Sequence, residues 1–327
     1  MKRGGEMSVH PRNRKSVISG TAYTRREVLG GMGVMFAAGT LLDSPLMAQL
    51  APAVPDSTPQ TGQTLLYGHR GALMYAPENT LPAFELCLIA GCGFEIDFYE
   101  LKDGEIIALH DGTFNRTTDT KTANDQAALR DLDYVKRLDA GSWFHPDFVG
   151  TRIPTLPEVC ELIRRRARGE SVVMLMDIKI LTDNFLARVK AEFEKTPTLF
   201  SRALFRVDTI AMAQRIKACD TRFSCVKSGN ETTLAREVLN SPLFDGIWTG
   251  STSNLAEIRK AGKSSYMTLF NRPEHILKYK AMGATGVITN YPTELKRIAY
   301  PPPPERDWNS YMKDEPQKDA YRFSGKI

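Results

Sequence analysis

The sequence predicts an α/β fold of the (β/α)8 TIM-barrel type. From Leu65 onward, short apolar runs alternate with helical patterns, which is typical of a repeating unit of one β-strand and one α-helix. The chain has 327 residues, of which 42% are hydrophobic. That is enough for one large domain on the scale of roughly 250 residues that such a barrel needs. Charged and polar side chains follow several of the apolar runs, at the points where consecutive strands would end.

The first 53 residues are set apart by their charge and predict a twin-arginine-type export signal. They hold seven Lys or Arg residues against three acidic ones. Arg25 and Arg26 precede a weakly apolar, glycine-rich run over 28–42, which is shorter than the roughly 20 residues that cross a bilayer. Cleavage after Ala48 or Ala53 would leave a periplasmic or secreted protein with no stable membrane span, after transient contact with the twin-arginine export machinery. A retained membrane anchor and a disordered basic tail are the alternatives.

The remaining chain divides into a linker over 54–64, the barrel over 65–298 and a C-terminal extension over 299–327. The linker is rich in Pro, Ser, Thr and Gln, and the extension begins with a run of prolines. Of the 43 basic and 38 acidic residues, 36 and 35 follow residue 53, so this part has a net charge of +1. That balance argues against a nucleic-acid partner, which would require a clustered basic surface.

Nine apolar runs predict strands, one more than an eight-stranded barrel holds. They cover residues 65–68, 93–98, 106–110, 172–179, 203–207, 222–227, 246–248, 266–270 and 286–289. Helical patterns cover residues 80–90, 156–168, 183–195, 209–218, 232–239, 253–261 and 273–282. One strand prediction must therefore fail, and the three-residue run 246–248 is the weakest.

The second and third predicted strands are joined by a very short segment. If Asp97 and His110 lie at the same rim, these strands are parallel and the chain must return between Phe98 and Gly104. A segment of this length spans at most about 23–25 Å when extended but only about 10 Å as a helix. We therefore expect an extended return in place of a helix between strands 2 and 3. The long irregular segment 111–151 is expected to lie over the same rim.

Glu95 and Asp97 are two residues apart on a predicted strand, so both side chains face the same way. Two carboxylates on one face inside a barrel repel each other unless a cation lies between them. Oxygen ligands of this kind suit a divalent cation, Mg²⁺ or Ca²⁺. The alternative is a solvated polar strand face, which the apolar neighbours disfavour.

His69 and His110 each follow a short apolar strand, as a catalytic pair at a barrel rim would. Imidazole titrates near neutral pH, so one ring can accept a proton from an attacking hydroxyl while the other donates a proton to a leaving oxygen. A lone histidine is more often structural. Two histidines that flank a pair of carboxylates favour the catalytic interpretation.

Two cations accompany these groups. Arg70 offers a bidentate fork for phosphate, and Lys179 lies two residues after Asp177, on the same face of its strand. Either cation could instead be a structural ion-pair partner of Glu78 or Asp111.

Three further polar residues are expected to support the site: Glu78, Asn79 and Asp111. Glu78 and Asn79 follow Pro77 in a pattern that also begins a helix, so a cap for the first helix is the alternative. Asp111 directly follows His110 in the sequence.

These motifs resemble the glycerophosphodiester phosphodiesterase family, within the wider group of phosphatidylinositol-phospholipase-C-like barrels. The resemblance runs from about residue 65 to residue 295. It rests on His69-Arg70-Gly71, Pro77-Glu78-Asn79-Thr80, Glu95-Ile96-Asp97, Lys102-Asp103-Gly104, His110-Asp111, Arg116-Thr117-Thr118, 139–144, Ile153-Pro154-Thr155-Leu156 and 286–292. Members of this family are (β/α)8 barrels that use a divalent cation to hydrolyse glycerophosphodiesters to glycerol 3-phosphate and an alcohol.

The resemblance implies a role for each matching residue. His69 and His110 would be the acid–base pair, and Arg70 would bind the phosphate. The metal ligands would be Glu95, Asp97 and Asp177. Lys179 would stabilise negative charge on the phosphoryl oxygens. A metal-dependent phosphodiesterase with a glycerophosphodiester or lysolipid substrate is therefore the leading interpretation.

Three positions depart from the family pattern. Asp177 stands where the family usually has Glu, one methylene longer, and Asn290 stands where it usually has Asp. The aromatic residue of the strand over 267–271 is displaced as well. Asp177 resembles the sphingomyelinase D branch, so a sphingomyelinase-D-like or lysophospholipase-D-like lipase stays open. A catalytically silent phosphate-ligand binding protein is the third alternative.

Overall fold

The computed structural model describes residues 64–167, 169, 171–229 and 232–299. The predicted export signal over 1–53, the linker up to residue 63 and the extension from residue 300 lie outside these described residues and stay predictions. Within the described ranges, no helix combines the length and the apolar character that crossing a membrane requires.

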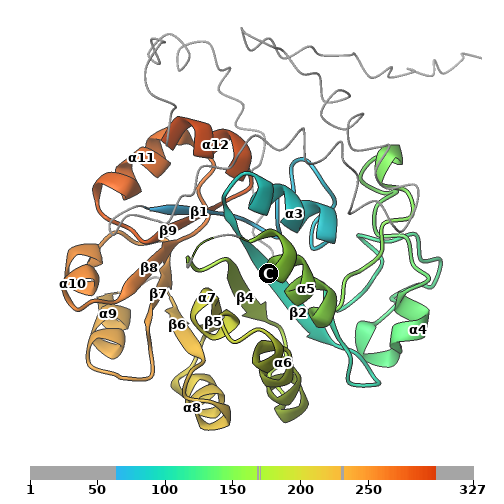
Figure 1. The fold of residues 1–327 in the computed structure, drawn as a ribbon, viewed down its shortest axis with the longest axis horizontal. Helices are drawn as coiled ribbons and strands as arrows, with labels where there is room; N and C mark the ends of the chain where they lie inside the picture. The colour runs from blue at the N-terminus through green and yellow to red at the C-terminus, as the bar shows by residue number, and fades with distance from the viewer. Residues whose placement is uncertain (1–63, 168, 170, 230–231, 300–327) are drawn as a thin grey trace, which may run out of the picture.

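Eight parallel strands close into a barrel, which confirms the predicted fold class (Figure 1). In order around the barrel they are β1 (Leu65–Gly68), β2 (Gly93–Glu100), β4 (Met174–Ile178), β5 (Ala203–Val207), β6 (Ser224–Ser228), β7 (Gly246–Thr249), β8 (Ser264–Met267) and β9 (Gly286–Thr289). Parallel pairing of β1 with both β2 and β9 closes the ring. The weakest strand prediction, 246–248, is thus confirmed as β7.

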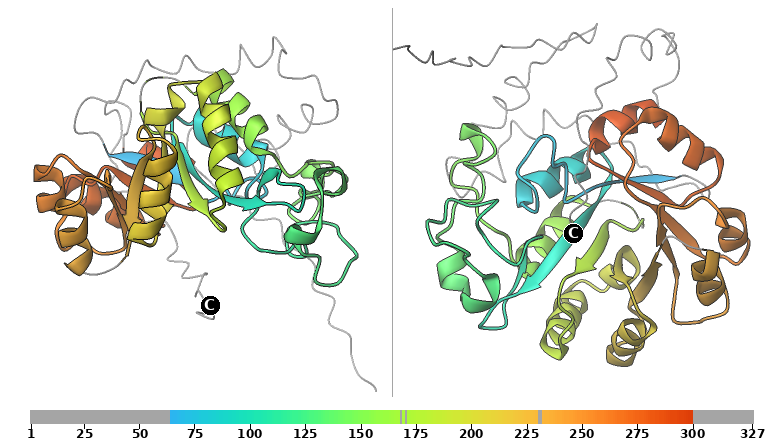
Figure 2. Two further views of the ribbon diagram at one scale, coloured as in Figure 1. Left: turned by 90° about the horizontal axis from the view of Figure 1, so that it is seen from below. Right: turned by 180° about the vertical axis from the view of Figure 1, so that it is seen from behind.

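Helices lie outside the barrel and cover its strands (Figures 1 and 2). The main ones are α3 (Leu81–Ile89), α5 (Leu156–Arg166), α6 (Asp183–Lys195), α8 (Ile210–Cys219), α9 (Thr232–Leu239), α10 (Leu255–Lys260), α11 (Pro273–Ala281) and α12 (Pro292–Ala299). Thr155 and Glu158 begin α5 with a capping box, which satisfies two backbone N–H groups that the helix itself cannot. The sequence analysis missed α12 and the short α7 (Leu199–Arg202).

Apolar side chains fill two layers. In the layer between strands and helices, Phe84 of α3 stacks on Phe94 of β2 with ring centroids 4.5 Å apart. The layer inside the barrel takes one side chain from every barrel strand except β2: Tyr67, Leu175, Leu204, Val226, Trp248, Tyr266 and Ile288. Glu95 pairs in register with Leu175 and therefore faces the same interior. β2 is thus the strand that brings a carboxylate into the barrel.

The predicted extended return between strands 2 and 3 is wrong. β3 (Ile106–Ala108) pairs antiparallel with the C-terminal end of β2, at residues 98–100, and lies outside the barrel. In the turn between them, the backbone N–H of Leu101 donates to Glu105 O at 2.8 Å and that of Gly104 donates to Leu101 O at 3.0 Å. A connection this short allows a hairpin, whereas parallel neighbours need a crossover of a dozen or more residues.

Most of the segment 111–151 lies beside the barrel next to β3, and not over the rim as expected (Figures 1 and 2). Its start does reach the rim, where Arg116 contacts Glu78 in the loop after β1. The segment contains η2 (Ala127–Leu129), α4 (Leu132–Val135) and η3 (Pro146–Phe148). Its apolar side chains form a separate small core with Ile107 and Leu109 at β3. The hairpin created this second core, because an antiparallel β3 exposes a face that the barrel itself does not cover.

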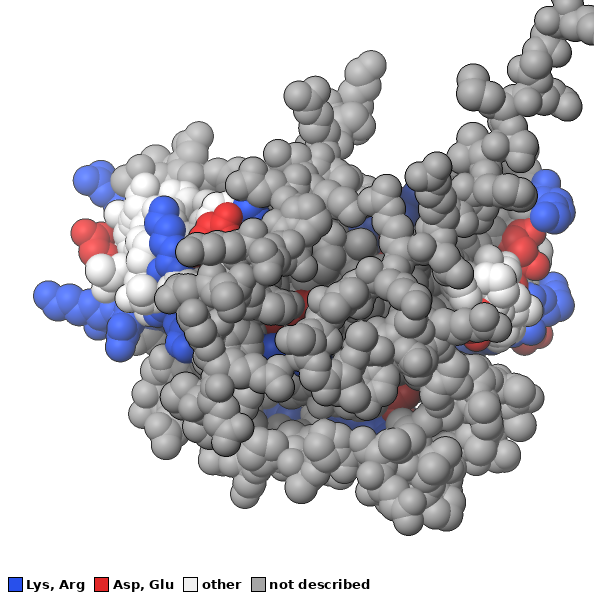
Figure 3. Space-filling view, turned by 90° about the horizontal axis from the view of Figure 1, so that it is seen from above, with Lys and Arg blue, Asp and Glu red and all other residues white. Residues whose placement is uncertain are grey.

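The described surface mixes both signs of charge. In the view of Figure 3, Lys and Arg side chains lie beside Asp and Glu side chains at both ends of the molecule. Opposite charges placed side by side limit the electric field that either end projects.

Gly104 provides a test of the hairpin. Its φ of +80° lies in the left-handed region, and an added Cβ would lie 3.0 Å from Asn184 Nδ2. We predict that Gly104→Ala lowers the free energy of unfolding by about 1–2 kcal/mol, and that Gly104→Asn costs less because asparagine adopts this backbone conformation more readily. Urea unfolding measures both values. Wild-type stability of Gly104→Ala would contradict the turn.

Candidate active site

The segments that follow β1 and β3 approach the same stretch of β2 at the carboxyl end of the barrel. β1 and β3 share one edge of β2 and leave residues 95–97 between them. In this gap the backbone N–H groups of Gly71 and Leu109 donate to main-chain carbonyls of the stretch, at 3.2 and 3.0 Å. His69 and His110, which precede and follow these anchors, are therefore held beside the inward-facing carboxylates of β2.

Two residues of the loop after β1 adopt a left-handed backbone conformation, which costs a non-glycine residue on the order of 1 kcal/mol. Arg70 has φ +52°, and its N–H donates to Glu95 Oε2 at 2.7 Å. Asn79 has φ +54°, and its Nδ2 donates to Asp97 Oδ2 at 2.8 Å. The carboxylates of β2 therefore hold the loop in this conformation, and the loop in turn encloses them.

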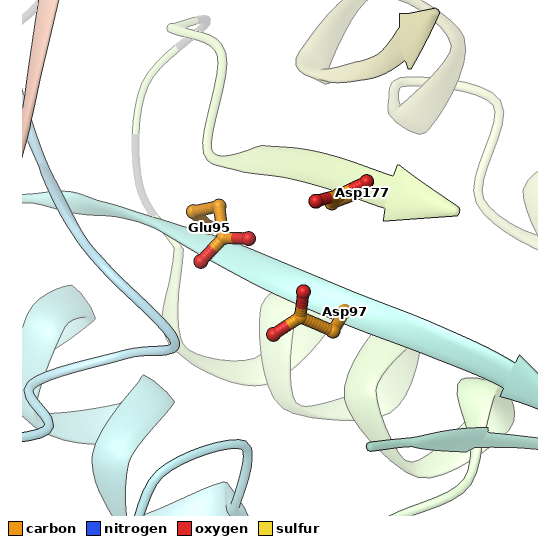
Figure 4. Close-up of side chains that lie close together, drawn as sticks. All are labelled: Glu95, Asp97 and Asp177. Atoms are coloured by element: carbon orange, nitrogen blue, oxygen red, sulfur yellow. The ribbon is translucent and has the colours of Figure 1, made fainter. Parts of the chain in front are cut away.

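Three carboxylates form the centre of the site. Figure 4 shows Glu95 and Asp97 on β2 and Asp177 on β4 with their carboxylate groups turned toward one another. One oxygen from each lies within 4.8 Å of the others, since Asp97 and Asp177 are partners in the β2–β4 register. Glu95 and Asp97 are only 3% and 1% exposed. This is a donor set for a hard divalent cation that prefers oxygen ligands.

The electrostatics of the three carboxylates fit such a cation. Burial, and then repulsion by Asp97 and Asp177, raises the pKa of Glu95 well above its usual range. Burial alone would also raise the pKa of Asp177, but Lys179 and Arg206 outweigh that effect and lower it. Glu95 is thus the carboxylate that most lacks nearby positive charge. A cation among the three would favour its ionised form.

Lys179 connects two of the three carboxylates. Its Nζ lies 2.7 Å from Asp97 Oδ1 and 2.9 Å from Asp177 Oδ2. Burial alone would lower the pKa of Lys179, but these two carboxylates outweigh it and raise the pKa, so the side chain is a fixed ammonium. A positive charge therefore lies at the position the sequence predicted.

A chain of ion pairs leads from Arg70 to His110. Arg70 Nη1 lies 2.9 Å from Glu78 Oε1, and Arg116 binds both carboxylate oxygens of Glu78 at 2.7 Å. Arg116 Nε also donates to Asp111 Oδ2 at 2.6 Å, and Asp111 Oδ1 accepts from His110 Nδ1 at 2.8 Å. Burial would raise the pKa of Glu78, but the two arginines outweigh it and lower the pKa. Glu78 therefore stays ionised and aligns both guanidinium groups.

His69 lies in a drier setting than His110. Burial, and then the charge of Arg70, lowers the pKa of His69 from 6.5 to about 4. Its Nδ1 lies 2.9 Å from Asn290 Oδ1, a pure acceptor, so Nδ1 carries the proton and Nε2 has a free lone pair. Near neutral pH this ring is uncharged and can accept a proton at Nε2.

The structure places all ten predicted site residues at this end of the barrel. Contacts join nine of them directly or through Arg116, whereas the ring of His69 binds Asn290. The sequence analysis missed what Arg116, Arg206 and Asn290 contact. Arg116 and Asn290 bind residues far away in the sequence, and no local pattern predicts such partners. Arg206 could have been found, because it follows Leu204 by two residues and must face the barrel interior with it.

A parallel barrel that gathers two buried carboxylates and one partly buried carboxylate with arginine, lysine and histidine side chains has the makeup of a metal-assisted phosphate-ester hydrolase. Comparison with protein families narrows this class. Residues 69–294 match the model of the glycerophosphoryl diester phosphodiesterase family, so the chain belongs to that family and is a phosphodiesterase.

Relatives and solved structures agree with this membership. The chain is 27% identical over 245 residues to the putative glycerophosphodiester phosphodiesterase YhdW of Bacillus subtilis, which covers 69% of this chain and 94% of the relative. It is 24% identical to a second Bacillus subtilis protein, a glycerophosphodiester phosphodiesterase, over 72% of this chain and 86% of the relative. The matches therefore span most of the length of both relatives but leave more than a quarter of this chain outside them.

Two solved structures share the fold. A putative glycerophosphoryl diester phosphodiesterase of Silicibacter pomeroyi aligns with a TM-score of 0.63 at 22% identity, covering 73% of this chain and 94% of its own. A phosphodiesterase of Oleispira antarctica, solved with the product sn-glycerol-3-phosphate, aligns with a TM-score of 0.60 at 22% identity, covering 73% and 97%. At this identity the likeness establishes the barrel fold.

The carboxylates can be tested by the affinity of the protein for divalent cations. We predict that Asp177→Asn weakens Mg²⁺ or Ca²⁺ binding by about 10–100-fold or more, since even outer partners of metal ligands have effects of that size. Isothermal titration calorimetry measures the dissociation constants. Asp183→Asn is the matched control, because Asp183 lies at the start of α6 and its side chain is 95% exposed. Equal affinity of Asp177→Asn and wild type would contradict the assignment.

Proposed function

We propose that this protein is a divalent-cation-dependent phosphodiesterase that hydrolyses glycerophosphodiesters to glycerol 3-phosphate and an alcohol. The observation that carries the proposal is the set of three carboxylates, two buried and one partly buried, with His69 and His110 held beside it by the backbone anchors at Gly71 and Leu109. Membership of the family implies a glycerophosphodiester substrate. Lysolipids, in which one hydroxyl of the glycerol is acylated, are the related substrate class.

A divalent cation held by Glu95, Asp97 and Asp177 would supply positive charge to the non-bridging phosphate oxygens. Arg70 adds a second positive group through its planar fork, which Glu78 and Asp97 already orient. Lys179 adds a third and keeps Asp97 and Asp177 from repelling each other. Stabilisation of charge in the transition state by these groups is the largest expected contribution to the rate.

The two histidines divide the proton transfers between them. His69 Nε2 accepts the proton of the attacking hydroxyl. That hydroxyl belongs either to water, which gives glycerol 3-phosphate directly, or to C2 of the glycerol, which gives a cyclic phosphate that water then opens. His110 donates a proton to the oxygen of the departing alcohol as its bond to phosphorus breaks. Asp111 supports this donor role, because its carboxylate accepts a hydrogen bond from Nδ1 and so fixes the orientation of the ring.

Substitution of the histidines tests these roles. We predict that His69→Ala and His110→Ala each lower turnover of glycerophosphoglycerol by about 10²–10⁴-fold, the usual loss when an acid or base is removed, while the circular dichroism spectrum stays that of the folded barrel. His145→Ala is the control, because His145 binds only its own loop at Asp147. Near-wild-type turnover in either active-site variant would show that the ring is not needed for proton transfer.

A substrate panel tests the reaction itself. We predict release of glycerol 3-phosphate from glycerophosphoglycerol and glycerophosphocholine with Mg²⁺ or Ca²⁺, and its loss with EDTA, because the carboxylates alone repel the anionic substrate. Lysophosphatidylcholine and sphingomyelin complete the panel. Cleavage of these lipids alone would replace the proposal by the lipase alternative. Binding without turnover under every cation would indicate the catalytically silent alternative.

A further inference from the structure

A line of three charged residues crosses the inner face of the barrel. Asp97 on β2 pairs in register with Asp177 on β4, and Asp177 pairs in register with Arg206 on β5. Residues in register on neighbouring strands face the same way, and neighbouring strands lie about 4.8 Å apart. Arg206 is therefore the inward-facing residue immediately beyond the carboxylates, on the side away from the loop that carries His69.

The guanidinium group of Arg206 is held but not enclosed. Nη1 lies 2.9 Å from Asp177 Oδ1, and Nη2 lies 3.0 Å from Asp208 Oδ1. A guanidinium has five N–H groups, so these two contacts leave others for a further acceptor. The side chain of Arg206 is 25% exposed, which leaves it reachable from the rim.

Trp248 provides one wall beside Arg206. Cζ of Arg206 lies 5.9 Å from the centre of the indole ring, within the range of a cation–π contact, and Trp248 is 6% exposed. An indole face of this kind is also where a quaternary ammonium group binds in other proteins. Here the positively charged guanidinium group of Arg206 already lies beside the indole ring of Trp248. A cationic head group at this position would be repelled, whereas an anionic one would be attracted.

Lys179 is shared between Asp97 and Asp177, and Arg206 adds a second positive charge at Asp177. Arg206 also places a fixed, forked donor on the inner face of the barrel, immediately beyond the three carboxylates. A group reached from the scissile phosphate through a few bonds of the departing alcohol would arrive there. Planar N–H forks of this kind recognise phosphate and carboxylate oxygens in pairs.

We propose that Arg206 is a specificity-determining residue that binds an anionic group on the alcohol part of the substrate, so that diesters with a second phosphate are preferred. This inference rests on the proposed function and deepens it. The substrate class is a glycerophosphodiester whose alcohol carries another phosphodiester, such as 1,3-bis(glycerophospho)glycerol. Glycerophosphoglycerol is the matched neutral-alcohol substrate, because it lacks only the second phosphate arm.

The test compares kcat/KM for these two diesters in wild type, Arg206→Gln, Arg206→Lys and Arg222→Gln. The quantity compared is kcat/KM for 1,3-bis(glycerophospho)glycerol divided by kcat/KM for glycerophosphoglycerol. We expect Arg206→Gln to lower this ratio by about tenfold or more, the effect of losing a charge-assisted hydrogen bond. Arg206→Lys should keep part of the ratio. Arg222→Gln is the control, because Arg222 pairs with Asp220 just before β6, at the opposite end of the barrel.

The ratio separates recognition from positioning. If Arg206 only held Asp177 in place, its loss would lower both substrates equally and leave the ratio unchanged, which would overturn the inference while the proposed function stood.

Dissociation constants of both diesters in the His110→Ala background decide the inference even if no diester is hydrolysed. Tighter binding of the bis-phosphate that depends on Arg206 supports the inference, and equal affinity overturns it. Absence of turnover on every diester, by contrast, counts against the proposed function alone.

Discussion

Three carboxylates within 4.8 Å of one another inside a barrel are the constraint on which the rest of the site depends. Water cannot solvate this interior fully, so the negative charge must be compensated by nearby cations and donors. Each element around β2 supplies one. Lys179 directly follows β4, and Arg70 and Asn79 lie in the loop after β1. Within the described ranges no ion pair joins Glu95 to a positive side chain, and its carboxylate accepts from the backbone N–H of Arg70.

The same constraint explains the unusual backbone of the loop after β1. Left-handed conformations at Arg70 and Asn79 carry a cost, yet each places a donor on a carboxylate of β2. Glu78, between them in the loop, then gathers Arg70 and Arg116. Through Arg116 the network reaches Asp111 and so sets the tautomer of His110. This network positions His110, whereas His69 is held at the same edge of β2 by Asn290.

Much of the fold was predictable because strands buried on both faces are apolar runs, and even the three-residue run of β7 followed that rule. The direction of β3 could not be predicted, since an apolar run does not reveal which strand it pairs with or whether the pairing is parallel. A requirement that His110 share the rim with Asp97 was met by a hairpin instead of a parallel strand. In the site, alternation along β2 predicted the pair Glu95 and Asp97. The strand-end pattern singled out Asp177, but its role as a third metal ligand followed only from the family resemblance. The contact of Arg116 with Glu78 could not be inferred from the sequence because it joins distant segments.

The central claim is that Glu95, Asp97 and Asp177 hold one divalent cation. A crystal structure of the protein grown with Mn²⁺, with anomalous scattering recorded at the manganese edge, tests it most directly. The account predicts one anomalous peak with an oxygen of all three carboxylates about 2.0–2.6 Å away. A peak elsewhere in the barrel, or none while Lys179 still bridges Asp97 and Asp177, would contradict it.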